Sequence, residues 1–148
     1  MKSNSAVETK KIAAIIAATL VRAKPKTHAR VVTLLGDLGA GKTTFIQGFA
    51  HALGIKHRIT SPTFVIIKRY KLKRPPYKNL YHLDAYRISH IKELAPLEFD
   101  EVLANPLNII LIEWANNLKG ARFTKPVNLS LRHGKKEHER IITIRGLK

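Results

Sequence analysis

The chain has 148 residues, of which 45% are hydrophobic and 25% are charged, values typical of one globular domain, and we expect a single domain over residues 1–148. The absence of cysteine excludes disulfides and cysteine-ligated metal or redox sites and suits a cytoplasmic location. Lys and Arg number 27 against 10 Asp and Glu, and this net charge of +17 predicts attraction to nucleic acid, nucleotides or an acidic partner.

The first predicted element is a helix over residues 6–22, in which apolar residues recur at helical spacing. Two lysines followed by ten apolar or small residues resemble a short signal peptide, but Glu8 before them and Arg22 after them fit that interpretation poorly. Ten residues are also too few to span a bilayer. We therefore interpret the segment as an amphipathic helix that packs on the domain, with no membrane contact.

A glycine-rich loop lies between a predicted buried strand, residues 29–35, and a predicted helix, residues 43–53. It matches the phosphate-binding pattern G-x-x-x-x-G-K-[ST]. In such a loop the glycines let backbone amides converge on phosphates, the lysine reaches the β- and γ-phosphates, and the hydroxyl ligates Mg²⁺. The candidate nucleotide-binding residues of the loop are Gly36, Asp37, Leu38, Gly39, Ala40, Gly41, Lys42, Thr43 and Thr44. Of these, Lys42 is the catalytic candidate and Thr43 the metal ligand.

The rest of the chain predicts mostly strands. They are expected at residues 61–70, 79–87, 108–114, 127–133 and 138–146, the first two forming a hairpin around Pro75 and Pro76. Residues 90–104 show weaker helical patterning with a break at Pro96. This order predicts an α/β fold, a three-layer P-loop NTPase domain with a mixed parallel and antiparallel sheet.

Two acidic residues stand at the ends of predicted strands, where an NTPase needs an acid for Mg²⁺ and the attacking water. Asp84 ends one strand and Glu113 ends the apolar run "IILIE". Both are candidate catalytic residues and metal ligands, and the alternative for each is a strand-end cap or a surface ion pair. His82 alternates with Asp84, and we interpret it as a hydrogen-bonded strand histidine.

Taken together, these motifs resemble the TsaE family, the ATPase subunit of the bacterial apparatus that makes threonylcarbamoyladenosine on tRNA. The resemblance runs from about residue 8 to residue 118, through "GDLGAGKTTFIQGFAHALG", "SPTF", "HLDAYR", "EL" and "IEW" in order and spacing. It implies a subunit that binds ATP and Mg²⁺ and hydrolyses ATP. It also implies action on a threonylcarbamoyl transferase complex of TsaB- and TsaD-type subunits, rather than on the tRNA chemistry itself.

The resemblance also implies roles outside the loop. Thr9 would lie near the base or ribose, and Trp114 would lie beside Glu113 near the partner surface, with a core aromatic as the alternative for Trp114. The implied switch-like loop that senses the γ-phosphate consists of Ser61, Pro62 and Thr63. Asp84 and Glu113 would be the acids around the metal and the water.

Two positions depart from the family pattern. Asn116 stands where a second acid usually follows the tryptophan, and Glu98 stands where a glycine is usual. These departures concern partner contacts and the hydrolysis rate rather than the phosphate loop. Two other functions stay open: a small-molecule kinase, for whose acceptor pocket and lid the chain has little room, and a nucleotide-dependent docking module with negligible hydrolysis.

Residues 68–78, "KRYKLKRPPYK", contain six of the 27 Lys and Arg residues. Cations with interleaved Tyr70 and Tyr77 suit a phosphate backbone and an unstacked base, so direct contact with tRNA is one interpretation of this basic ribbon. The other is a solvated edge that keeps a generally basic protein soluble, since basic residues run through the whole chain.

Overall fold

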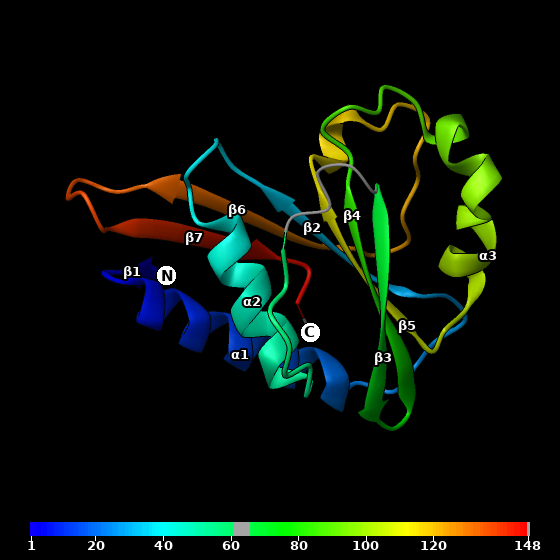
Figure 1. Cartoon of the computed structure of the whole chain (residues 1–148), viewed down its shortest axis with the longest axis horizontal. Coiled ribbons are helices and arrows are strands. Elements are labelled where there is room, and N and C mark those ends of the chain that lie inside the picture. The colour runs from blue at the N-terminus through cyan, green and yellow to red at the C-terminus, as the bar shows by residue number, and fades with distance from the viewer. Residues whose placement is uncertain (61–65, 148) are drawn as a thin grey trace.

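The computed structural model describes residues 1–60 and 66–147, and within these ranges seven strands form one sheet (Figure 1). The strands are β1 (Lys2–Ser3), β2 (Arg30–Leu35), β3 (Ile67–Arg74), β4 (Tyr77–Asp84), β5 (Asn108–Glu113), β6 (Val127–His133) and β7 (Arg140–Arg145). The helices are α1 (Ala6–Arg22), α2 (Lys42–Ala52) and α3 (Phe99–Ala104), with 3₁₀ helices η1 (Ile91–Leu97) and η2 (Ala115–Asn117).

The sheet is mixed, in the order β1-β7-β6-β2-β5-β4-β3. Strand β2 pairs in parallel with β5 and β6, and β4 pairs in parallel with β5. The β3–β4 and β6–β7 hairpins and the β1–β7 pair are antiparallel. This arrangement confirms the predicted α/β class. It also brings the carboxyl ends of β2, β4 and β5 to one edge, where ligands of open α/β sheets bind.

Helices cover both faces of the sheet, so the three predicted layers are present (Figure 1). Helices α1 and α2 lie on one face and bury a cluster that includes Ile16, Phe45 and Leu111. The second cluster, on the opposite face, includes Phe99 of α3 and Ile110 of β5. Leu111 and Ile110 of β5 thus pack in different clusters, because neighbouring side chains of a strand point to opposite faces of the sheet.

Helix α1 has the predicted bounds because its first turn is capped by side chains. The Ser5 hydroxyl accepts a hydrogen bond from the Glu8 amide at 3.1 Å, and the Glu8 carboxylate accepts one from the Asn4 amide at 2.7 Å. Caps of this kind satisfy amides that have no partner within the helix. Close packing on α2 requires Gly48, where an added Cβ would lie 2.6 Å from Lys10 Cα.

Three details differ from the sequence prediction. Strand β1 was not predicted, because two residues carry no readable alternation. Strand β3 extends to Arg74, beyond the predicted end at residue 70, while residues 61–65 of the predicted strand lie outside the described residues. The helical region 90–104 is interrupted as predicted, but the break lies at Glu98, whose φ of 54° is left-handed, and Pro96 lies inside η1. The φ of proline is fixed near the value found in helices, so Pro96 can lie within a helical turn. The change of chain direction occurs instead at Glu98, whose φ is not helical.

Candidate nucleotide-binding and hydrolysis site

The glycine loop leaves β2 and enters α2 through two positions that only glycine suits. Gly36 has a φ of 152°, and an added Cβ would lie 2.5 Å from the carbonyl oxygen of Leu131. Gly41 is the N-cap of α2, with a left-handed φ of 98°. The Phe45 amide donates to the Gly41 carbonyl at 2.9 Å, so the amides that precede it stand outside the helical ladder. They can bind phosphate at the positive end of the α2 dipole.

Lys42, the first residue of α2, folds back onto the loop. Its side-chain ammonium donates to the carbonyl of Gly36 and, at 3.0 Å, to that of Asp37. The ammonium also lies 4.8 Å from the centroid of the Trp114 ring, within the range of a cation–π interaction. Lys42 is only 8% exposed, so its charge is held where phosphates would enter.

The two acids lie side by side next to the loop. Asp84 and Glu113 are register partners on the parallel strands β4 and β5. Together with Leu38, Gly39, Gly41, Lys42, Thr43, Thr44 and Trp114, they line a hollow of about 380 Å³. Mg²⁺ is typically held by one or two carboxylates plus substrate phosphates, so the hydroxyl, carboxylates and ammonium gathered here fit a magnesium–nucleotide complex.

The environments of the two acids differ. Glu113 is 4% exposed, and its carboxylate lies 2.8 Å from the Nε2 atom of His82, which is 2% exposed. An ionised carboxylate only accepts, so with Glu113 ionised the Nε2 atom of His82 is the donor of this bond. Asp84 is half-buried and accepts a hydrogen bond from the Tyr86 amide at 3.0 Å, the strand-end contact considered as its alternative. Glu113 is therefore not in a surface ion pair, and the interpretation of His82 as a hydrogen-bonded strand residue is confirmed.

The contact between His82 and Glu113 leads to a prediction about positioning. We expect His82→Leu to lower the free energy of unfolding by about 1–3 kcal/mol, since a buried acceptor loses its donor. The variant should also lower turnover, because Glu113 loses the contact that orients its carboxylate. His82→Gln, whose amide can donate, should recover part of both losses, as measured by chemical denaturation and phosphate release. Equal turnover in the Leu variant and the natural protein would contradict a positioning role.

Thr9 lies on the other side of the loop. It lines a hollow of about 170 Å³ with Gly39, Gly41, Thr44 and Arg140, among others. The Thr9 hydroxyl is buried and lies 2.7 Å from that of Ser3. Arg140, which the sequence interpretation missed, donates to the Gly39 carbonyl at 3.3 Å. No local motif marks it, because the two residues are brought together only by the β6–β7 hairpin beside β2.

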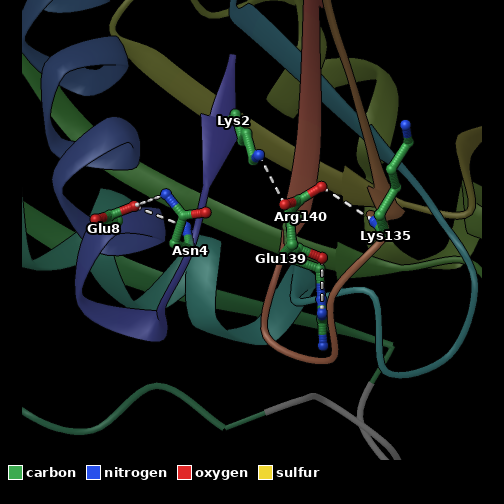
Figure 2. A network of polar contacts seen from close by, with 6 residues as sticks. All are labelled: Lys2, Asn4, Glu8, Lys135, Glu139 and Arg140. Carbon is green, nitrogen blue, oxygen red and sulfur yellow. Dashed lines mark hydrogen bonds and ion pairs between the residues drawn. The ribbon is translucent and has the colours of Figure 1, made fainter.

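A polar network holds this hairpin turn against the N-terminus (Figure 2). The Lys2 ammonium lies 2.8 Å from the Glu139 carboxylate, which also accepts a hydrogen bond from the Lys135 amide at 3.0 Å. These two contacts, with Lys2 the stronger, hold the pKa of Glu139 below its usual value. Because Arg140 follows Glu139 directly, the network also positions the arginine that contacts the loop.

Trp114 is half-buried between the site and the surface. Its φ of 58° turns the chain sharply after β5, and its ring contacts Tyr86 edge-on at a centroid distance of 5.2 Å. The contact with Lys42 makes Trp114 a wall of the hollow, so neither a purely core nor a purely surface role describes it. The neighbouring Asn116 is exposed.

The described residues cover only part of the predicted site. The switch candidates Ser61, Pro62 and Thr63 lie outside the described residues. Within residues 1–60 and 66–147 there is no group of three or more His, Cys, Asp or Glu side chains that could hold a metal ion. No helix in these ranges is long and apolar enough to cross a membrane.

The basic ribbon 68–78 forms β3, its turn and the start of β4. Tyr70 and Leu72 pack with the cluster under α1 and α2, so the alternating Arg69 and Lys71 face the other side of the sheet. The cations of the ribbon therefore do not form one continuous row. Their contact with tRNA stays a prediction.

Comparison with known proteins identifies relatives of this chain. The profile of the family described as "Threonylcarbamoyl adenosine biosynthesis protein TsaE" matches residues 3–142. A curated relative from Bacillus subtilis (strain 168), a tRNA threonylcarbamoyladenosine biosynthesis protein TsaE, is 48% identical over 109 residues, 74% of this chain and 61% of the relative. A protein with the same description from Rickettsia typhi (strain Wilmington) is 43% identical over 78% of this chain and 74% of its own length.

A solved structure is similar over the whole chain. The crystal structure of Bacillus subtilis YdiB, a P-loop fold, superposes with a TM-score of 0.74 at 34% identity, covering 100% of this chain and 84% of YdiB. The chain spans less than two thirds of some curated relatives, 61% of the Bacillus protein and 55% of a Synechocystis protein with the same description.

Proposed function

Because the chain belongs to the TsaE family, which takes part in tRNA threonylcarbamoyladenosine biosynthesis, we propose that it binds and hydrolyses ATP in the service of that modification. It would act on a partner transferase complex of TsaB- and TsaD-type subunits, without making the bond to tRNA itself. The observation that carries the proposal is the single hollow that joins Lys42, Thr43, Asp84 and Glu113 at the end of the parallel strands.

Each group that lines the hollow has its own role in the proposed ATP hydrolysis. The first-turn amides of α2 receive the phosphates, and Lys42 exchanges the carbonyls of its own loop for β- and γ-phosphate oxygens, which are stronger acceptors. Thr43 and the acids would hold Mg²⁺, which when bound neutralises charge on these oxygens. Glu113, oriented by His82, is suited to align a water molecule. The water oxygen would bond to the γ-phosphorus while the bond to the bridging oxygen breaks and leaves its electron pair on ADP; the proton lost by the water goes to the released phosphate or to solvent.

A turnover assay tests the proposal against its alternatives. The chain would be incubated with ATP and Mg²⁺, with and without purified transferase subunits and with a set of small-molecule acceptors. An ATPase releases inorganic phosphate, a kinase transfers it to an acceptor, and a docking module binds ATP without either product. Absence of phosphate release with every partner present would refute the proposed hydrolysis.

We expect the isolated chain to hydrolyse ATP slowly and the transferase complex to accelerate it. P-loop enzymes often need an arginine to match charge on the γ-phosphoryl group. Arg140 contacts the loop, but it donates to the carbonyls of Gly39, Glu137 and Glu139. Asn116 is also neutral at a position where the family resemblance implies an acid. Phosphate release would be followed as subunits are added, with Lys42→Ala as the background; fast hydrolysis by the chain alone, unchanged by partners, would contradict this expectation.

A further inference from the structure

A second and larger hollow, of about 740 Å³, lies away from the nucleotide site. It is bounded by α1, the second half of α2 and residues 55–59, the segment that follows α2. It shares no lining residue with the two hollows beside the glycine loop. The proposed ATP chemistry therefore leaves this hollow unexplained.

The hollow has a cationic rim and an apolar floor. Lys10 and Lys11 from α1 and Lys56 and Arg58 from the following segment line it, and all four are exposed. No Asp or Glu is among the described residues that line it. The floor includes apolar side chains such as Ile55, which is 5% exposed. A rim of four cations without a compensating acid attracts a polyanion, and the floor accepts a flat apolar group.

Strand β3 extends this surface. Arg74 donates to the Ala52 carbonyl at 2.7 Å, and the Lys68 ammonium donates to the Thr60 hydroxyl at 3.3 Å. The rings of His57, which lines the hollow, and Tyr70 lie 5.3 Å apart. Cations of the ribbon on this face of the sheet thus join those of α1 and the 55–59 segment, with an aromatic pair between them.

We propose that this basic hollow, defined by Lys10, Lys11, Lys56 and Arg58, binds unpaired nucleotides of an RNA. The four cations would contact backbone phosphates, while the floor and the His57–Tyr70 pair would receive unstacked bases, the mode by which proteins bind single-stranded RNA. A volume of about 740 Å³ lies within the range of ligand pockets. The preference for RNA over an acidic protein surface rests on the proposed function in tRNA modification.

Fluorescence anisotropy with a labelled tRNA transcript tests the proposal across a series of KCl concentrations. The hollow variant replaces Lys10, Lys11, Lys56 and Arg58 with Gln. The matched control replaces the same number and kinds of exposed cations away from the hollow, Lys26, Lys92, Lys119 and Arg122. Because each phosphate contact contributes about 0.7–0.9 to the slope of log affinity against log salt, the hollow variant should lose about three units of slope and the control far less.

Two further probes separate RNA binding from general charge. A single-stranded RNA should bind more tightly than a fully paired duplex of equal length, because only unpaired bases can enter the hollow. Equal loss of slope in both variants, or tighter binding of polyglutamate than of RNA to the natural protein, would overturn the proposal. If the fourfold variant folds poorly, the double variant Lys56→Gln, Arg58→Gln, which leaves α1 untouched, takes its place. Its slope of log affinity against log salt should decrease by about half as much as expected for the fourfold variant.

Phosphate release distinguishes this proposal from that of ATP hydrolysis. Both variants should hydrolyse ATP like the natural protein, because none of the replaced side chains lines the nucleotide site. If the natural chain proves inactive as an ATPase but the variants show the expected slopes, RNA binding by the hollow is supported and the proposed hydrolysis is refuted. If hydrolysis is normal and the slopes of the two variants agree, the RNA-binding hollow is wrong.

Discussion

Replacing Lys42 with Ala is expected to lower ATP turnover by about 100-fold or more, the effect of removing one preorganised donor from developing charge. Lys42 is 8% exposed and is the first residue of α2, beside the proposed phosphate position. ATP affinity should fall as well, by about 1.5–3 kcal/mol, because one charge-assisted hydrogen bond is lost. Phosphate release and equilibrium binding of a fluorescent ATP analogue would measure the two effects separately.

Stability should change much less than activity. Among residues 1–60 and 66–147, the Lys42 ammonium donates only to carbonyls of its own loop and contacts the Trp114 ring, so the melting temperature of the variant should stay within a few degrees of that of the natural protein. Lys119→Ala, which removes an exposed lysine elsewhere, is the matched control and should leave turnover unchanged. Unchanged turnover in Lys42→Ala itself would refute the phosphate-loop interpretation.

The acid variants Asp84→Asn and Glu113→Gln are each expected to lower turnover by about 100-fold or more, the usual contribution of a positioned acid or base. They should differ in how they respond to Mg²⁺. A variant that binds ATP normally yet fails to hydrolyse it identifies the acid that orients water, whereas a variant whose ATP affinity no longer depends on Mg²⁺ identifies the metal ligand. Titrations of Mg²⁺ in binding and turnover assays would assign the two roles.

The structure makes Glu113 the more sensitive of the two positions. Its carboxylate is buried against His82, so replacement with Gln alters a buried contact, whereas Asp84 is half-buried. Asp100→Asn, an exposed acid on α3, is the control for loss of negative charge in a protein of net charge +17. Natural rates in both Asp84→Asn and Glu113→Gln, with partner subunits present, would exclude these residues from the chemistry.

Much of the fold is determined by local sequence signals. Helix α1 occupies the predicted residues 6–22, because its spacing of apolar residues and its Ser5 cap act within one helix. The strand before the glycine loop and the helix after it were predicted to within one residue at every boundary. The loop itself needs Gly36 and Gly41 for backbone reasons, and such requirements can be read from the residues alone.

Other features arise only from the tertiary structure, because they join residues far apart in the chain. The register between β4 and β5 decides that Asp84 lies beside Glu113 and that His82 can reach it. Antiparallel pairing of β6 with β7 brings Arg140 to the loop, 101 residues from Gly39. No local propensity encodes such distances, since they depend on which strands pair and in what register.

The distribution of positive charge also depends partly on the sequence and partly on the tertiary structure. The residues alone establish that the protein is strongly cationic and that the ribbon 68–78 is rich in Lys and Arg. The pleat of β3 then sends alternate cations to opposite faces, and the packing of α1 against α2 adds Lys10 and Lys11 to one of those faces. Charges that are adjacent along the chain therefore need not form one charged surface, because strand alternation and helix packing determine which charges lie together.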